Sequence, residues 1–341
     1  MASDILKISS STMRETLKSL FTKYGFTDAK ASLLSQTYTN STIDGVNSHG
    51  INRVPLFIEY IEKGQVDINA EAQKVQSLGS IERWDGKLGP GIINAVKCTD
   101  RAIELAKEYG IGMVSLRNTN HWMRGGTYGR RAADAGCIAL LFTNTQPNMP
   151  PWGGKYSRLG NNPLIVSIPR KEGHVVLDMA ISQFAFGKIK DYGLRGKKLP
   201  YPGGWDDADE LSNDPEKILG NERGLPIGYW KGSALSMVLD MLATILSAGD
   251  STAKIGKKEF ESGISQVYIC IYPKLFHDTE IQENLLQEII DYTHNVEPMH
   301  EGDRTYYPGE KTLLTRAKNT KEGIPVSEEV WTKILQLAAQ K

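Results

Sequence analysis

The sequence predicts an α/β fold of mixed α+β type, in which helical ends accompany a sheet-containing centre. Apolar residues recur at helical spacing through the first 65 residues, whereas short β-branched runs alternate with helices from about residue 75. A chain of 341 residues can also form two units of about 150 residues each. We therefore expect a helical unit of residues 1–75 plus about 310–341, and an α/β unit of residues 76–309.

Three helices are expected in the N-terminal region, each beginning at a polar residue. The first carries Met13 and Leu17 on its apolar face and ends near Gly25. Pro55 is tolerated in the first turn of the third helix, because N–H groups there lack intrahelical partners. The expected N-caps are Ser10, Ser11 or Thr12 for the first helix, Thr27 for the second and Asn52 for the third.

The centre of the chain alternates strands and helices. A helix from Asn94 to Tyr109 is expected to end at Gly110. Residues 193–228 are rich in Gly, Pro, Asp and Asn, which predicts a long surface excursion. The predicted strands, several of which should share one sheet, are Ile111–Leu116, Cys137–Thr143, Pro163–Pro169, Val175–Met179 and Gln266–Tyr272.

The most apolar stretch of the chain is Ser233–Ala248. A membrane-spanning helix needs about 20 apolar residues, and this stretch is shorter and contains Asp240. It is therefore predicted to be a buried core helix, and no membrane partner is expected. Further helices are expected around residues 281–296 and from about Ser327 to the C-terminus.

Charge and cysteine content argue against several classes of protein. Forty basic residues balance forty acidic ones, so no positive excess favours a nucleic-acid partner. The odd, widely spaced cysteines Cys98, Cys137 and Cys270 predict reduced thiols rather than a disulfide framework. The N-terminus lacks a basic segment followed by an apolar one. These features predict a cytoplasmic protein.

Common catalytic motifs are missing from the sequence. The six histidines form neither an H-E-x-x-H motif nor a Cys/His cluster, so no metal site is expected. No G-x-S-x-G elbow supports serine hydrolysis, and no phosphate loop of the G-x-x-x-x-G-K-[ST] type supports nucleotide-dependent transfer. The segment Gly89–Asn94 resembles G-x-G-x-x-G but lacks the third glycine, which argues against a Rossmann fold.

The segment Ser48–Arg53 brings an imidazole and a guanidinium together in a glycine-flanked turn. Reduction of a 2-oxo acid needs a proton donor that titrates near neutrality, which His49 supplies. It also needs a planar donor fork for the substrate carboxylate, which Arg53 supplies. The alternative from spacing alone is a capping histidine beside a surface arginine.

Three further segments have residue types suited to ligand contact. Asn118–Gly126, which contains His121, follows a predicted strand into a loop, where ligand-contacting side chains often lie. Lys231 lies at the start of the apolar helix, a position suited to a phosphate. Asp178 ends a predicted strand and can accept a hydrogen bond. The structural alternatives are a polar loop, a surface lysine and an ordinary strand end.

The motifs SHGINR, LRNTNHWMRGGTYG, PPWGGKYSRLGNNPLIVSIP and GYWKGSALSMVLDMLATILSAG occur in this order along nearly the whole chain. In this wording the sequence resembles the type-2 malate/L-lactate dehydrogenase family. Within the family it is most similar to members that reduce 2,3-diketo-L-gulonate, and HWMRGG is the most discriminating run. The resemblance implies a non-Rossmann fold of the sulfolactate/malate dehydrogenase type, a homodimer, and NADH as cofactor with NADPH as the alternative.

The resemblance also implies roles for individual residues. His49 would be the catalytic acid, Arg53 would hold the carboxylate of a small 2-oxo sugar acid, and His121 would lie near that substrate. The turn at residues 309–311 reads GEK and departs from the family pattern at its second and third residues. The implied cofactor contacts are His174, Val175, Val176, Leu177, Asp178, Met179, Ala180, Trp230, Lys231, Gly309, Glu310 and Lys311.

Two other functions stay open at the level of sequence. A sibling enzyme of the family would act on malate, lactate, sulfolactate, ureidoglycolate or a cyclic imino acid such as piperideine-2-carboxylate. A catalytically silent relative would bind ligands without turnover, although the presence of both His49 and Arg53 argues against it.

Overall fold

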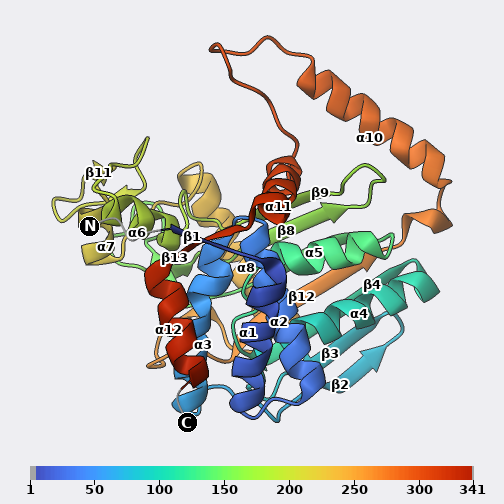
Figure 1. Cartoon of the computed structure of the whole chain (residues 1–341). Coiled ribbons are helices and arrows are strands. Elements are labelled where there is room, and N and C mark those ends of the chain that lie inside the picture. The colour runs from blue at the N-terminus through green and yellow to red at the C-terminus, as the bar shows by residue number, and fades with distance from the viewer. Residues whose placement is uncertain (1–4, 340–341) are drawn as a thin grey trace.

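The computed structural model describes residues 5–339, and its centre is a seven-stranded mixed sheet (Figure 1). β3 and β4 pair in parallel across a helical crossover, and the other neighbouring pairs of this sheet are antiparallel. β2 and β9 lie at its two edges, because each of them pairs with a single neighbouring strand of this sheet. In spatial order the strands are β2 (Gln73–Leu78), β3 (Ile81–Asp85), β4 (Ile111–Thr119), β12 (Ile264–Ile271), β5 (Ile138–Thr143), β8 (Leu164–Ile168) and β9 (Val175–Met179).

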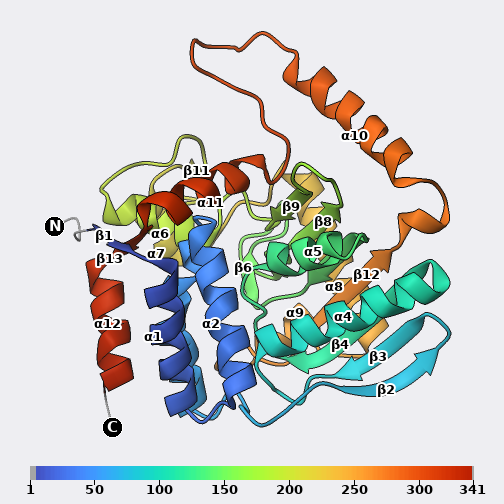
Figure 2. The ribbon, with the colours of Figure 1, turned by 45° about the vertical axis from the view of Figure 1, so that its right-hand side comes forward.

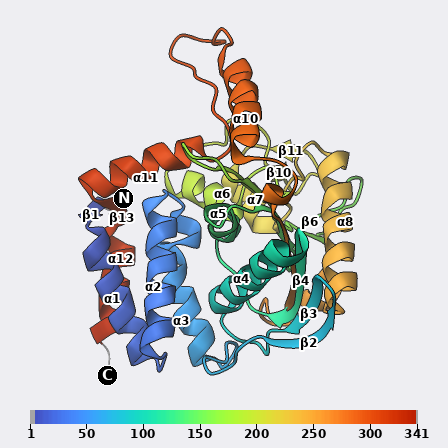
Figure 3. The ribbon, with the colours of Figure 1, turned by 90° about the vertical axis from the view of Figure 1, so that its right-hand side faces the viewer.

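Helices cover both faces of this sheet, as Figure 3 shows. α4 (Gly91–Tyr109) and α5 (Gly125–Asp134) pack on one face around buried Trp122, Tyr128 and Tyr268. α8 (Trp230–Ser247) packs on the other face through Leu239 and Ala243. Burial of each large apolar side chain contributes about 1.5–3 kcal/mol, so all three helices are held to the sheet by their apolar faces.

A second, helical core lies beside the sheet (Figure 2). α1 (Ser10–Lys23), α2 (Asp28–Ile43), α3 (Val54–Glu62) and α12 (Glu328–Ala339) surround stacked Phe21 and Tyr38, whose ring centroids are 5.7 Å apart. β1 (Ile5–Ile8) and β13 (Ile324–Ser327) pair antiparallel, and α11 (Glu310–Glu322) leads into β13. Ile92 and Met123 also join this core, and the bounds of the two predicted units stay a prediction.

Shorter elements connect these layers and complete the fold. In Figure 1, α10 projects from the body at the end of a long connection. The remaining elements are the 3₁₀ helices η1 (Asn47–His49), η2 (Ile51–Arg53) and η3 (Pro273–Leu275), the helices α6 (Phe186–Leu194), α7 (Pro215–Asn221), α9 (Thr252–Ile255) and α10 (Thr279–His294), and the two-stranded pairs β6 (Pro147–Met149) with β7 (Leu159–Gly160) and β10 (Gly204–Trp205) with β11 (Leu211–Ser212).

The predicted strands and central helix are confirmed to within a few residues, whereas two predicted caps are wrong. The hydroxyl of Ser9, one residue before the expected caps, accepts the Thr12 N–H at 3.0 Å. Thr27 caps α2 as expected. Asn52 does not cap α3, because a 3₁₀ turn occupies residues 51–53 and the helix begins after Arg53.

The predicted surface excursion at residues 193–228 is largely irregular but not structureless. It contains α7 and the β10–β11 pair. Together with α6 it encloses a small apolar core of Phe184, Ile189, Leu199 and Ile218. A segment rich in turn-forming residues therefore contains a small packed lobe.

The predicted buried core helix, observed as α8, is buried on one face alone. Its other face presents an apolar stripe of Met237, Val238, Met241, Leu242 and Ile245, with exposed fractions of 41–73%. The all-round apolar pattern made complete burial the natural prediction. In a single chain, however, the sheet covers only the face that contains Leu239 and Ala243.

Cys98, Cys137 and Cys270 are buried and form no disulfide, in agreement with the predicted reduced thiols. Burial raises the pKa of the Cys137 thiol to about 11, which keeps it protonated and unreactive near neutrality. Within residues 5–339, no helix has the length and apolar character to cross a membrane. The expected cytoplasmic location stays a prediction.

Candidate functional site

The turn that carries His49 folds back on the end of α2. The Thr42 hydroxyl accepts the Ile51 N–H at 2.9 Å and donates to the Tyr38 carbonyl at 2.7 Å. A Cβ on Gly50 would lie only 2.4 Å from this hydroxyl oxygen, so the close approach requires glycine. The turn thereby fixes the positions of His49 and Arg53.

His49 and His121 come together although 72 residues separate them in sequence. Their ring centroids are 5.7 Å apart and their planes differ by 28°. The Nδ1 atom of His121 accepts the Met123 N–H at 2.9 Å, which puts the ring hydrogen of the neutral form on Nε2. Burial, Arg53 and His49 lower the pKa of His121 well below its ordinary value, so His121 is a neutral donor.

The charges around His49 shift its pKa in opposite directions. Burial lowers the pKa of His49, and the positive charges of Arg53 and Arg124 lower it further, whereas the Asp178 carboxylate raises it. The Ser48 hydroxyl contacts the Nδ1 atom at 3.1 Å. The proton affinity of this imidazole therefore depends on where Asp178 and the two arginines lie.

Gly91 is the second glycine of the incomplete motif Gly89–Asn94. It begins α4 beside the His121 loop, and a Cβ there would lie 2.2 Å from the His121 carbonyl oxygen. The motif therefore permits close packing of α4 against the loop that holds His121.

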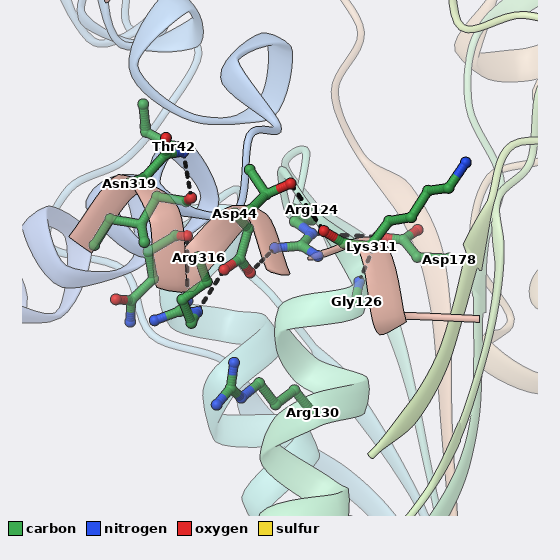
Figure 4. Close-up of polar contacts among 12 residues, drawn as sticks. Thr42, Asp44, Arg124, Gly126, Arg130, Asp178, Lys311, Arg316 and Asn319 are labelled. Carbon is green, nitrogen blue, oxygen red and sulfur yellow. Dashed lines mark hydrogen bonds and ion pairs between the residues drawn. The ribbon is translucent and has the colours of Figure 1, made fainter. Parts of the chain in front are cut away.

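A network of ion pairs lies next to His49, and Figure 4 shows Arg124 between Asp44 and Asp178. Arg124 hydrogen-bonds to Asp44, and its Nε atom lies 3.7 Å from Asp178. The other Asp44 oxygen accepts from Arg316 at 2.5 Å. No role for Asp44, Arg124 or Arg316 was predicted from the sequence. The discriminating HWMRGG run pointed at Arg124, whereas nothing local to Asp44 or Arg316 distinguishes them.

Beside this network lies a cavity of about 550 Å³ between α2, α5, the β8–β9 hairpin and the start of α11. Of the predicted cofactor contacts, His174, Val176 and Gly309 line it. Basic side chains outnumber acidic ones in its wall, as Arg124, Arg130, Arg131, Arg170, Lys171 and Arg316 face Asp44 and Asp134. An excess of positive charge in a concave site favours a phosphorylated ligand, which fits a nicotinamide dinucleotide.

The predicted stretch His174–Ala180 is the edge strand β9 with its flanking residues. Successive side chains of a strand point to opposite faces of the sheet, so the predicted contacts in this stretch fall into two groups. Val176 lines the cavity and Asp178 accepts the Gly126 N–H on the same face at 2.8 Å. Met179 instead packs in the core under α8. Val175 and Leu177 share its parity along the strand, so the pleat directs their side chains away from the cavity.

His174 and Gly309 connect β9 to the start of α11. His174 accepts the Arg170 N–H at 3.0 Å through Nδ1 and contacts Asp134 at 2.9 Å through Nε2. Gly309 has φ +97°, and a Cβ there would lie 3.1 Å from the Val176 nitrogen. The first turn of α11 thereby lies directly against the edge strand.

In the GEK turn, the side chains of Glu310 and Lys311 lie in different environments. The buried Glu310 carboxylate accepts from Arg304 at 2.6 Å and from the Tyr307 N–H at 3.1 Å, and it also contacts His294. The Glu310 carboxylate is therefore engaged in contacts with other residues of this chain. The Lys311 ammonium lies 4.4 Å from the Tyr306 ring centroid and is exposed.

Trp230 and Lys231 lie outside the cavity lining, at the exposed start of α8. They follow a segment that pairs with the far end of the β9 stretch, where the Ile227 N–H donates to the Ile181 carbonyl at 2.9 Å. Tyr229 before them has φ +59°, a strained conformation that clusters at functional sites. The predicted cofactor contacts thus occupy two ends of one edge strand.

Glu261 is a further charged residue for which the sequence predicted no role. Burial raises the pKa of its carboxyl, which accepts the Gln146 N–H at 3.0 Å and feels the positive charge of Arg53. It precedes β12 in a loop with no recognisable motif, so only the fold reveals its position.

Residues 8–335 match the family described as malate/L-lactate dehydrogenase. The chain belongs to this family. It is an oxidoreductase, and the family implies a nicotinamide cofactor. It is 41% identical to a 2,3-diketo-L-gulonate reductase of Klebsiella pneumoniae, covering 97% of this chain and 100% of that one. It is 43% identical to an Escherichia coli protein with the same description, covering 95% and 98%.

Solved structures agree with the fold of this malate/L-lactate dehydrogenase family member. Malate dehydrogenase from Entamoeba histolytica superimposes with a TM-score of 0.94 at 25% identity, covering 98% of both chains. Sulfolactate dehydrogenase from Methanocaldococcus jannaschii gives 0.87 at 27% identity, covering 97% of this chain and 96% of that one. The predicted fold of the sulfolactate/malate dehydrogenase type is confirmed.

Proposed function

We propose that this enzyme reduces 2,3-diketo-L-gulonate at C2 to 3-dehydro-L-gulonate, with NADH as the cofactor. The observation that carries the proposal is the convergence of His49, His121 and Arg53 beside a positively charged cavity. The names of the relatives at 41–43% identity support the substrate. A bound nicotinamide would supply the hydride.

The side chains of the site have separable tasks in this proposal. Arg53 binds the substrate carboxylate through its planar fork, which orients the neighbouring carbonyl. His49, as an imidazolium, donates a proton to the oxygen of that carbonyl as it becomes a hydroxyl. His121 stays neutral and offers its Nε2 hydrogen to the substrate. Val176, His174 and Gly309 would hold the cofactor along the edge strand.

The test measures oxidation of NADH through the loss of its near-ultraviolet absorbance. 2,3-Diketo-L-gulonate is compared with pyruvate, oxaloacetate and a cyclic imino acid, and each is repeated with NADPH. We expect preference for the diketo sugar acid and NADH. Preference for another substrate would retain the chemistry and overturn the substrate. Binding of NADH without turnover would instead indicate a silent relative.

We also propose that the enzyme is a homodimer. The exposed stripe of α8 supports this, and so does the projecting α10, where Ile281, Leu285, Ile289 and Tyr292 are 50–86% exposed. Large apolar patches of this kind are typical of protein interfaces.

Size-exclusion chromatography with light scattering tests the assembly. We expect twice the chain mass of 37.8 kDa and release of monomers by Ile245→Glu. The matched control is Val75→Glu, at an exposed apolar residue on β2, which should leave the dimer intact. A monomeric wild type would refute the dimer.

A further inference from the structure

The ion pairs near His49 link two carboxylates and two guanidinium groups in the order Arg316, Asp44, Arg124 and Asp178. The side chains of Asp44 and Arg124 are 5% and 10% exposed, so their interaction is little weakened by water. Arg316 satisfies the second oxygen of Asp44. Arg124 is thus shared between a strongly buried partner, Asp44, and the more exposed Asp178.

Asp178 has a second anchor at the start of α5. Its carboxylate accepts the Gly126 N–H at 2.8 Å, where the helix dipole also favours negative charge. A Cβ on Gly126 would lie 2.7 Å from this carboxylate oxygen. The glycine therefore leaves room for Asp178, and Arg124 limits the direction in which the carboxylate can move.

This arrangement joins the segments on which the proposed chemistry depends. Asp44 lies five residues before His49, Arg124 lies three residues after His121, and Asp178 belongs to the predicted cofactor stretch. Figure 4 shows that side chains from these distant segments meet at Arg124. A displacement of Arg124 would therefore change the surroundings of His49 directly.

We propose that Asp44 is a positioning residue that acts through Arg124, by drawing its guanidinium away from the Asp178 carboxylate. The inference deepens the proposed function and rests on it for the role of His49 as proton donor. Asp44 competes with Asp178 for the Arg124 guanidinium. It thereby leaves part of the negative charge of Asp178 to act on His49.

The charge balance predicts the effect of removing Asp44. The groups that face His49 are Arg53, Arg124, Asp178, His121 and the Ser48 hydroxyl. In Asp44→Asn, Arg124 turns fully to Asp178 and neutralises it. His49 then keeps the positive neighbours that lower its pKa and loses the negative one that raises it.

The test is an NMR titration of the His49 imidazole in the full chain, with its signal assigned by its loss in His49→Gln. We expect the protonated fraction of His49 at neutral pH to fall about three- to tenfold in Asp44→Asn. Asp44→Glu, which keeps the carboxylate, should restore most of it. The matched control is Asp100→Asn, which breaks the surface ion pair with Arg131 and should leave the titration unchanged.

An unchanged titration in folded Asp44→Asn would overturn the inference. If this variant does not fold, the double variant Asp44→Asn/Arg124→Gln is compared with Arg124→Gln, because removal of both buried charges is better tolerated than removal of one and Arg316 still pairs with Asp44 in the single variant. Asp44 acts through Arg124 in this inference, so the two titrations should coincide, and a lower protonated fraction in the double variant would overturn it. The titration needs no substrate, so absence of turnover would count only against the proposed function.

Discussion

The two halves of the candidate site are built differently. The proton-transfer half lies on two short turns, around His49 and His121, whose backbones are fixed by buried hydrogen bonds and by glycines that admit close contact. The proposed cofactor half extends along the edge strand β9 between the starts of α11 and α8. The difference is that packing within two turns fixes the first half, whereas the second half follows a strand at the edge of the sheet, where the Val176 N–H already donates to the Pro308 carbonyl.

The largest expected effect concerns the proton-transfer half. His49→Ala removes the general acid, which typically contributes about 10²- to 10⁴-fold, so kcat should fall by about that factor. Because the cofactor half lies elsewhere, the Kd for NADH, measured by fluorescence titration, should stay unchanged. His300→Ala, at an exposed histidine, is the control. A His49→Ala enzyme that retains most of its kcat would remove His49 from this role.

Arg53→Lys should produce the next largest effect, in substrate binding. An ammonium cannot replace the bidentate fork, and a charge-assisted hydrogen bond contributes about 1.5–3 kcal/mol. Steady-state kinetics should therefore show KM raised about 10- to 100-fold, with a smaller change in kcat. An unchanged KM would show that Arg53 does not bind the carboxylate.

The turn of His49 and Arg53 and the ion pairs of Arg124 differ in how far the sequence predicted them. His49 and Arg53 share one turn, so a short motif could place them together. The network around Arg124 was not predicted, because Asp44 and Arg124 are 80 residues apart and Asp178 and Arg316 lie still farther along the chain. Ion pairing between distant segments leaves no local pattern.

The fold was more predictable than the site for the same physical reason. Periodicity located α4, α8 and the strands of the sheet, since their apolar residues recur within one element. The exposed stripe of α8 and the packed lobe around Leu199 were not predicted. Both depend on which surfaces meet in three dimensions, whereas composition records only that the residues are apolar or turn-forming.

Gly309→Ala tests the cofactor half. The new Cβ would lie 3.1 Å from the Val176 nitrogen, and a strained backbone costs roughly 1–3 kcal/mol. We expect the Kd for NADH to rise about tenfold while the His49 titration stays unchanged. Gly302→Ala is the matched control, because its φ is also positive but no atom lies within 4 Å of the new Cβ. Equal effects in both variants would mean that strain alone, and not the contact with β9, is responsible.

The smallest effect is a difference between two pH profiles of the wild-type enzyme. In the proposed mechanism reduction requires the His49 imidazolium, so the rate should fall as pH rises through the pKa of His49, which burial and Arg53 hold below its ordinary value. The substrate carboxylate would neutralise Arg53 and so raise this pKa in the complex. The fall in kcat should therefore occur at higher pH than the fall in kcat/KM, which reports the free enzyme. Coincident profiles would mean that Arg53 and His49 do not meet the same substrate molecule.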